Sequence, residues 1–481
     1  MLKQTPLWLL LGLCVLVWSS ASDAQLPEDY QRLIDQGEFS AAQRLMRLEL
    51  AINQQLEPLQ RLTIAFEIER LDRIRKDFTK TRDDILPDIQ RYVPNVTEAD
   101  LTRWEQERSL EYRIIDGSKL YFNSAVPNLF RIDRKLKEIK RNQDGPPAPR
   151  RYNRLEDVRS IIQTSLQTGK KYVNPVRARV TYTLTLNKNA VPKGKIVRCW
   201  LPFPREIPER QTDVTLVSCF PERYLIAPND DYLQRTIYFE QPSAGDQETT
   251  FRVVLEFTNH AVYQPIDPRR ITPVRPTPEL ARYLGERPPH ILFSDNLKKL
   301  SRQIVGNETN PYFIAKKIFK YIHDNIPWAS AREYSTLENI SEYVYQNHHC
   351  DCGMHQIFFM TLCRINGIPT RWQSGWTTDA DYHGMHDWGE IYFEPYGWLP
   401  VDSDVGLLDS SDEQERWFYL GGMDAYRLII NDDYGQNLYP AKIHFRSETL
   451  DFQRGEVEWE AGNLYFDQWR WDYQVELLEE K

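Results

Sequence analysis

The pattern of apolar and charged positions divides the chain into regions with different predicted secondary structure. In the first region, Ile64, Ile68, Leu71, Ile74 and Phe78 recur at helical spacing with charged residues between them. Such spacing is typical of an amphipathic helix. The pattern ends at the proline-rich stretch 144–150, because proline and glycine oppose helix continuation. We therefore predict a helical N-terminal region over 25–150, with a packing or partner-binding role.

The apolar period shortens to two residues after residue 174. Alternate positions from Val176 to Leu186 are apolar, the positions between them are polar or charged, and 251–257 repeats the alternation. This pattern predicts half-buried strands. The stretches IVRCW and VTLVSCF between them are also strand-like. We predict a β-sandwich over 170–265.

Helical spacing returns beyond a proline-rich connection. Asn310 before Pro311 predicts a helix start, since asparagine caps helices and proline suits the first turn. A second helix is predicted from residue 352, with Phe358 and Leu362 on one face and Gly367 as its stop. We assign 270–410 to an α+β core. Residues 411–481, rich in aromatic and acidic side chains, are predicted to form a β-rich extension packed on that core.

The N-terminus carries one lysine, an apolar run over 7–18 and then small residues, which is the layout of a secretory signal peptide. The run is short for a membrane-spanning helix. We therefore predict that 1–24 is removed on export, leaving a secreted or periplasmic protein with no stable membrane insertion. A net charge of −9 argues against nucleic-acid binding.

Cys14, one of the six cysteines, lies in the predicted signal peptide, so the exported chain keeps an odd number. At least one thiol should then stay free or pair between molecules. Cys199 and Cys219 fall in predicted strands, where a cross-strand disulfide and two separate thiols are equally consistent with the sequence. A bridge between Cys350 and Cys363 is also open.

The stretch HHCDCGMH, 348–355, is dense in groups that bind metals or act as nucleophiles. A zinc site is one interpretation, but a structural zinc site usually has a second ligand pair at a distance, and none is evident. A bridge between Cys350 and Cys352 would be strained. The remaining interpretation is a catalytic thiol, and no metal or other cofactor is predicted.

Cys352 is the better candidate for that thiol, because it begins the predicted helix. Free backbone N–H groups and the helix dipole favour a thiolate at a helix N-terminus. A cysteine nucleophile also needs a base held by a third group. The segment MHDWGEIYFEPYGWLPVDSD predicts a hairpin that brings His386 and Asp402 within reach of each other.

These residues resemble the transglutaminase-like superfamily. The similarity covers about 310–405 and includes C-G before a helix, NGIPTRWQSGW, H-D-W-x-E and GWLPVD, in the order of the family. The resemblance implies a papain-like α+β core and a Cys–His–Asp triad, with Cys352 as nucleophile, His386 as base and Asp402 as the acid that orients the base. Some relatives place an aromatic residue upstream as an oxyanion-hole donor, so Trp328 is a candidate oxyanion-hole or cleft residue, with a packing role in the core as the alternative.

The resulting hypothesis is a multidomain protein with an α-helical N-terminal region, a β-sandwich and a transglutaminase-like core. It is expected to be an exported cysteine enzyme that acts on amide bonds of a protein or peptide through a thioester. The sequence does not choose between hydrolysis and transfer to an amine. The alternative is a non-catalytic extracellular binding or scaffolding protein that keeps the core.

Overall fold

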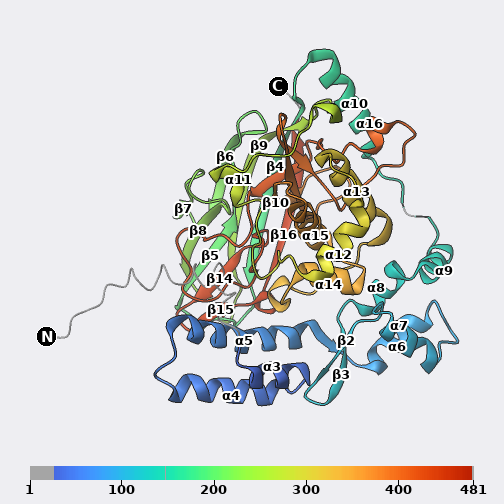
Figure 1. The fold of residues 1–481 in the computed structure, drawn as a ribbon. Coiled ribbons are helices and arrows are strands. Elements are labelled where there is room, and N and C mark those ends of the chain that lie inside the picture. The colour runs from blue at the N-terminus through green and yellow to red at the C-terminus, as the bar shows by residue number, and fades with distance from the viewer. Residues whose placement is uncertain (1–25, 147, 479–481) are drawn as a thin grey trace. The chain divides into compact units, whose positions relative to one another are not determined.

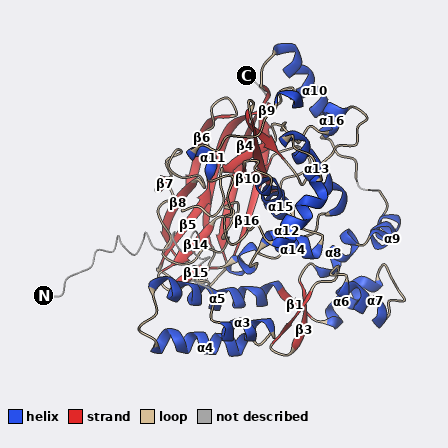
Figure 2. Ribbon diagram, viewed as in Figure 1, coloured by secondary structure: helices blue, strands red, loops and turns tan. Residues whose placement is uncertain are grey.

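The computed structural model describes residues 26–146 and 148–478. They form two compact units, each made from several stretches of the chain. Helices and strands are mixed (Figure 2), and the strands pair into several antiparallel sheets. Unit 1 contains the described residues of Met1–Ala148, Glu286–Leu297 and Asp324–Phe358, and unit 2 those of Pro149–Gly285, Lys298–His323 and Phe359–Lys481.

Unit 1 consists mainly of helices around one hydrophobic cluster that includes Phe39, Leu71 and Trp104. Thr81 and Thr97 each cap a helix and form a capping box with an aspartate three positions later. The helices α3, α4 and α5 lie side by side (Figure 1). The helices that lie wholly in unit 1 are α3 (Glu28–Asp35), α4 (Phe39–Ile52), α5 (Pro58–Asp77), α6 (Arg82–Gln90), α7 (Glu98–Gln106), α8 (Ala125–Ile132), α9 (Arg134–Asp144), η2 (Tyr334–Thr336) and α14 (Ile340–Asn347).

A small sheet interrupts these helices, although helical spacing alone was predicted for this region. Its strands are β1 (Phe78–Lys80), β2 (Tyr112–Ile115) and β3 (Ser118–Phe122), in the order β1-β3-β2. Asp116 and Gly117 join β2 to β3, and both have positive φ values, 49° and 83°. An Asp-Gly pair favours this tight hairpin turn, because both residues tolerate positive φ. The dipeptide was therefore a local signal for the sheet.

Asp77, at the end of α5, supplies a prediction about the stability of unit 1. Its carboxylate accepts hydrogen bonds from the Thr336 hydroxyl, at 3.1 Å, and from the Glu333 backbone N–H, at 3.2 Å. Burial, and then the charge of Glu333, raise the pKa of Asp77 to about 7. Because an unfolded aspartate titrates near 3.9, the folded chain holds the extra proton between about pH 4 and 7. Stability should therefore fall as pH rises through this window, where the unfolded state binds fewer protons.

We expect Asp77→Asn to remove most of this pH dependence, since the amide oxygen still accepts hydrogen bonds and carries no charge. Relative to the wild type, the variant should gain on the order of 2–4 kcal/mol between pH 5 and pH 8. Urea unfolding at both pH values measures the difference. Asp88→Asn, at an exposed position of α6, is the matched control and should follow the wild type. An Asp77→Asn variant whose stability changed with pH as the wild type does would contradict the prediction.

Two antiparallel sheets make up much of unit 2. One has the strand order β16-β4-β9-β6 and the other β15-β14-β5-β8-β7. Their inward side chains, such as Tyr182, Trp200 and Phe251, join one hydrophobic cluster. Cys199 lies on β5 and Cys219 on β6, so these thiols belong to different sheets, and neither is in a disulfide. The strands are β4 (Tyr172–Leu186), β5 (Ile196–Pro202), β6 (Gln211–Phe220), β7 (Tyr224–Ile226), β8 (Thr236–Pro242), β9 (Thr249–Val262), β14 (Glu456–Trp459), β15 (Gly462–Leu464) and β16 (Trp469–Leu478).

The C-terminal strands are divided among three sheets. β13 (Arg427–Asn431) pairs with β10 (Thr370–Thr377), which lies in the predicted core. In contrast, β14 pairs with β5, and β16 pairs with β4 along ten residue pairs. The sequence predicted a β-rich C-terminal extension on the core, whereas most of its strands complete the two larger sheets.

A four-stranded antiparallel sheet of order β12-β11-β10-β13 forms the centre of the predicted core. β11 (Met385–Phe393) and β12 (Gly397–Val401) form a hairpin within this sheet.

Asn310 caps the helix that begins at Pro311, because its Oδ1 accepts from the Tyr312 N–H at 2.9 Å. Three helices have residues in both units: α12 (Asp295–Val305), α13 (Pro311–Asn325) and α15 (Cys352–Ile365). The other helices of unit 2 are α10 (Arg154–Thr168), η1 (Pro268–Arg270), α11 (Pro278–Ala281), α16 (Glu413–Arg416) and η3 (Phe466–Gln468).

The predicted signal peptide, 1–24, lies outside the described residues. Within 26–146 and 148–478, no helix combines the length and the apolar character that spanning a membrane requires.

Candidate active site

Cys352 is the first residue of α15. Asp351, directly before it, accepts a hydrogen bond from the Met354 N–H at 3.1 Å and so caps the helix. The Tyr334 hydroxyl lies 2.8 and 2.9 Å from the two oxygens of Asp351 and fixes this cap. Cys352 itself is half-buried. Its thiol thus lies at the N-terminal end of a helix, where the helix dipole favours a negative charge.

The other groups of HHCDCGMH take structural places. His349 Nε2 donates to the Arg108 carbonyl at 3.2 Å, and His355 Nε2 donates to the Ile326 carbonyl at 2.9 Å. His348 ends α14 in the left-handed conformation, with φ 55°. The Cys350 carbonyl accepts from the Ala329 N–H at 2.8 Å. These contacts order the backbone around the start of α15.

Trp328 forms an isolated parallel β-bridge with Cys350. The next residue, Ala329, donates its backbone N–H to the Cys350 carbonyl. The Trp328 indole is 43% exposed, and the Arg131 guanidinium lies over the ring at 4.8 Å from the centroid. Trp328 is therefore not a core residue, contrary to one of the two interpretations of the sequence. The cation–π contact with Arg131 orients the ring.

His386 and Asp402 come together through the hairpin of β11 and β12. The register pairs Phe393 with Gly397 and Gly389 with Val401. Asp402 follows the end of β12 and therefore lies diagonally across from His386. His386 Nε2 and Asp402 Oδ2 are 2.8 Å apart, and both side chains are buried. Nε2 donates to the carboxylate, so in the neutral imidazole Nδ1 has the lone pair that a base requires.

Asp402 is held by groups beyond the histidine. Its Oδ1 accepts from the backbone N–H groups of Asp404, at 3.1 Å, and Val405, at 2.9 Å. The Arg427 guanidinium lies 3.0 Å from Oδ2. Burial alone would raise the pKa of Asp402, but the charges of His386 and Arg427 outweigh it and hold that pKa well below its usual range. The carboxylate is therefore ionised at any physiological pH.

Arg427 belongs to a second buried pair that the sequence did not predict. It lies 3.4 Å from Asp424, whose Oδ2 also accepts from the Tyr419 hydroxyl at 2.8 Å. Arg427 comes from β13, outside the segment whose motifs were recognised. No turn or spacing signal connects it to Asp402, so only the pairing of β13 with β10 could have identified it.

Trp388 packs beside the His386 ring. The two rings are stacked with centroids 5.9 Å apart, and Trp388 Nε1 donates to Gln373 Oε1 at 3.0 Å. On the opposite side, Gln453 Nε2 donates to the His386 carbonyl at 2.8 Å. The stacked Trp388 ring and the hydrogen bond from Gln453 to the His386 carbonyl together fix the position of the imidazole.

The described His, Cys, Asp and Glu side chains close enough to share a metal ion are His386, Asp402 and Asp404. His386 Nδ1 lies 3.9 Å from Asp404 Oδ2, in addition to the Asp402 contact. Because Nε2 already donates to Asp402, this arrangement fits an orienting acid and a base at least as well as a metal centre. None of the three residues comes from HHCDCGMH.

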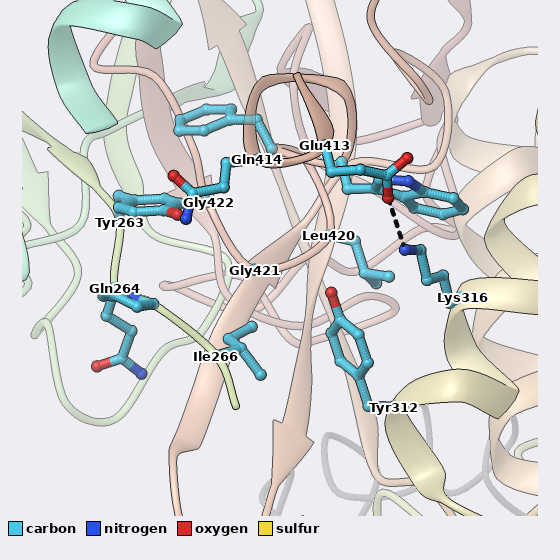
Figure 3. Close-up of a pocket in the computed structure, with 13 residues that line it drawn as sticks. Tyr263, Gln264, Ile266, Tyr312, Lys316, Glu413, Gln414, Leu420, Gly421 and Gly422 are labelled. Carbon is cyan, nitrogen blue, oxygen red and sulfur yellow. Dashed lines mark hydrogen bonds and ion pairs between the residues drawn. The ribbon is translucent and has the colours of Figure 1, made fainter. Parts of the chain in front are cut away.

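A pocket of about 180 Å³ in unit 2 is lined by residues other than His386 and Asp402 (Figure 3). Tyr263 and Phe418 stack at one side, with ring centroids 6.0 Å apart. Lys316 Nζ pairs with Glu413 at 3.2 Å and lies 4.1 Å from the centre of the Trp417 ring. The charge of this lysine is thus balanced within the pocket.

Comparisons with known proteins address the core. No curated protein sequence matches the chain. A crystal structure from Cytophaga hutchinsonii, of a protein whose proposed activity is that of a cysteine protease, is similar at 14% identity and a TM-score of 0.45, covering 64% of this chain and 93% of that one. The periplasmic domain of TgpA from Pseudomonas aeruginosa is similar at 14% identity and a TM-score of 0.25, covering 52% of this chain and 90% of that one.

The family comparison is independent of these structures. Residues 298–403 match the sequence profile of the Transglutaminase-like superfamily. This stretch contains Cys352, His386 and Asp402. Over residues 298–403 the chain is thus similar to the transglutaminase-like superfamily.

Proposed function

We propose that this protein is an exported cysteine enzyme that cleaves or transfers acyl groups at amide bonds of a protein or peptide. The observation that carries the proposal is the buried His386–Asp402 pair, with 2.8 Å between Nε2 and Oδ2. A base oriented by a buried carboxylate is what a cysteine or serine nucleophile requires.

Cys352 is the proposed nucleophile. It belongs to unit 1, and His386 and Asp402 belong to unit 2, so their joint action is inferred from their order within the transglutaminase-like segment. The position at the start of α15 supports the assignment, because a helix N-terminus lowers the cost of a thiolate. Trp328 remains a candidate cleft residue, with its exposed indole available to a substrate.

The proposed reaction has two stages. The Cys352 thiolate attacks the amide carbonyl, and the N–H groups at the start of α15 are candidates to stabilise the oxyanion. Protonated His386 gives its proton to the leaving amine as the C–N bond breaks, which leaves a thioester on Cys352. His386 then accepts a proton from water or from a second amine, which attacks the thioester and releases the thiolate. Water completes hydrolysis, and an amine completes transfer.

The experiment is turnover by the mature chain on casein and a peptide panel, with and without a primary amine, read by mass spectrometry. Cleavage or deamidation indicates hydrolysis, and a mass increase by the amine indicates transfer. Cys352→Ala is assayed in parallel. Equal behaviour of the two proteins on every substrate would instead support the alternative, a binding or scaffolding protein, for which the aromatic pocket of Figure 3 is the candidate surface.

Export is also part of the proposal and rests on the predicted signal peptide, 1–24. The measurement is the N-terminal sequence of the protein recovered outside the cytoplasm. A mature N-terminus beginning after Ala21 or Ala24 is expected.

A further inference from the structure

A second pocket in unit 2, of about 60 Å³, lies against the hairpin that carries His386. Trp388 and Trp398 of β11 and β12 form part of its wall. The volume exceeds the space that one water molecule needs and excludes large organic molecules. Five charged residues line it: Lys171, Arg210, Arg371, Glu390 and Asp432.

The two acids of this pocket already have partners. Glu390 pairs with the Arg371 guanidinium through Nε. Asp432 Oδ1 accepts a hydrogen bond from Gln373 Nε2 at 2.8 Å. Of the three cations, Arg371 is therefore balanced, which leaves Arg210 and Lys171 without a carboxylate of the pocket at bonding distance.

Arg210 is buried, with 6% of its surface exposed. Its Nη2 donates to the Asp424 carbonyl at 3.2 Å, and Nη1 is enclosed with no hydrogen-bond partner among the described residues. The nearby Asp424 carboxylate is engaged by Arg427 and by the Tyr419 hydroxyl. A buried cation without a counter-charge is unfavourable, because the interior solvates charge poorly. Burial accordingly lowers the pKa of Arg210 to about 10.

Lys171 adds a second cation to the same wall. Its Nζ donates to the Trp398 carbonyl at 3.3 Å, and burial lowers its pKa. The lining charges therefore sum to a positive excess when both cations are protonated. A water molecule in the pocket would not balance this charge.

We propose that this pocket binds a small monovalent anion, chloride or a carboxylate of one or two carbons, with Arg210 as its principal ligand and Lys171 as a second cation. A carboxylate or a halide in the pocket supplies the missing negative charge beside the Arg210 guanidinium. The site is independent of the chemistry proposed for Cys352.

The anion site has a structural connection to the candidate base. Trp388 lines the pocket and stacks on the His386 ring at 5.9 Å between centroids. Its indole N–H is linked through Gln373 to Asp432, which is also on the pocket wall. An anion at Arg210 would therefore stabilise the wall against which the imidazole packs.

Thermal unfolding of the mature chain at constant ionic strength tests the proposal. Sodium chloride and sodium acetate are each exchanged for sodium gluconate, whose anion is too large for the pocket. We expect Tm to rise by about 2–4 °C in chloride or acetate and to saturate with concentration. A rise with only one of them identifies the preferred anion, and equal Tm values in all three salts would overturn the proposal.

Arg210→Gln is expected to lose the anion-dependent rise in Tm. Arg235→Gln is the matched control, because Arg235 is also buried, bonds to the carbonyls of Pro204 and Ala227 and does not line the pocket. It should keep the response even if it is less stable. A response that survives in Arg210→Gln would contradict the assignment of the site.

Wild-type protein provides a measurement that does not depend on the folding of a variant. Crystals soaked in sodium bromide should give an anomalous peak within hydrogen-bond distance of the Arg210 guanidinium. Absence of a peak in the pocket at saturating bromide, with peaks elsewhere on the protein, would overturn the proposal independently of any activity assay.

Discussion

Replacing Cys352 with alanine is expected to reduce kcat/KM by on the order of 10⁴- to 10⁶-fold on any amide substrate that the wild type turns over. Without the thiolate no thioester forms, and the remaining groups can only polarise the substrate. The measurement is steady-state turnover, with intact-mass detection of the acyl-enzyme in the wild type. A variant that retains a tenth of the activity would exclude Cys352 as the nucleophile.

The other thiols provide controls for this experiment. Burial raises the pKa of Cys199 and of Cys363 well above the usual value, and it also raises that of Cys219. These thiols should therefore react slowly with an alkylating agent near neutral pH, because the thiolate is the reactive form. Cys219→Ala, on half-buried β6, should keep activity within a factor of about two. Fast labelling should disappear with Cys352→Ala and slow markedly with His386→Ala.

Asp402→Asn is expected to lower kcat by on the order of 10³- to 10⁴-fold with little change in KM. The wild-type carboxylate only accepts hydrogen bonds, so it selects the His386 tautomer with the proton on Nε2. An amide at this position can donate instead, which would move the proton to Nδ1 and remove the base. The change acts on the chemical step, since no substrate contact is altered.

Asp424→Asn is the control that separates the expected change of His386 tautomer from a general loss of buried ion pairs. It removes a carboxylate that lies 3.4 Å from Arg427 but leaves the contact between His386 and Asp402 in place. We expect it to lower Tm while kcat stays within about a few-fold of the wild type. If Asp424→Asn and Asp402→Asn lowered kcat equally, the Asp402 effect would be structural and not tautomeric.

The parts of the site that the sequence predicted depend on local signals. The start of α15 at Cys352 was predicted from an apolar helical face and from Gly367 beyond its end, and the structure has the helix at Cys352–Ile365. The hairpin turn near 394–397 placed Asp402 diagonally across from His386, and the two are in contact. Their catalytic roles remain predictions.

The parts that the sequence missed depend on long-range pairing. Arg427 reaches Asp402 because β13 pairs with β10. The local sequence of a strand does not indicate which other strand it will pair with. The pairing of β16 with β4 could not be predicted from local sequence for the same reason. The density of ligands in HHCDCGMH was misleading for a different reason, since His349 and His355 serve backbone carbonyls. Both histidines hold backbone positions near the start of α15.

The pairing of β16 with β4 also constrains when the protein can fold. Trp469 lies opposite Leu186 and Leu478 opposite Arg177, so these contacts join residues that are almost 300 positions apart. β4 is synthesised long before β16, so the edge that β16 covers stays open until β16 has emerged. A chain still being made therefore cannot close this sheet. Such high contact order slows folding, so the β4 edge stays unpaired for longer than it would in a sheet of sequence neighbours.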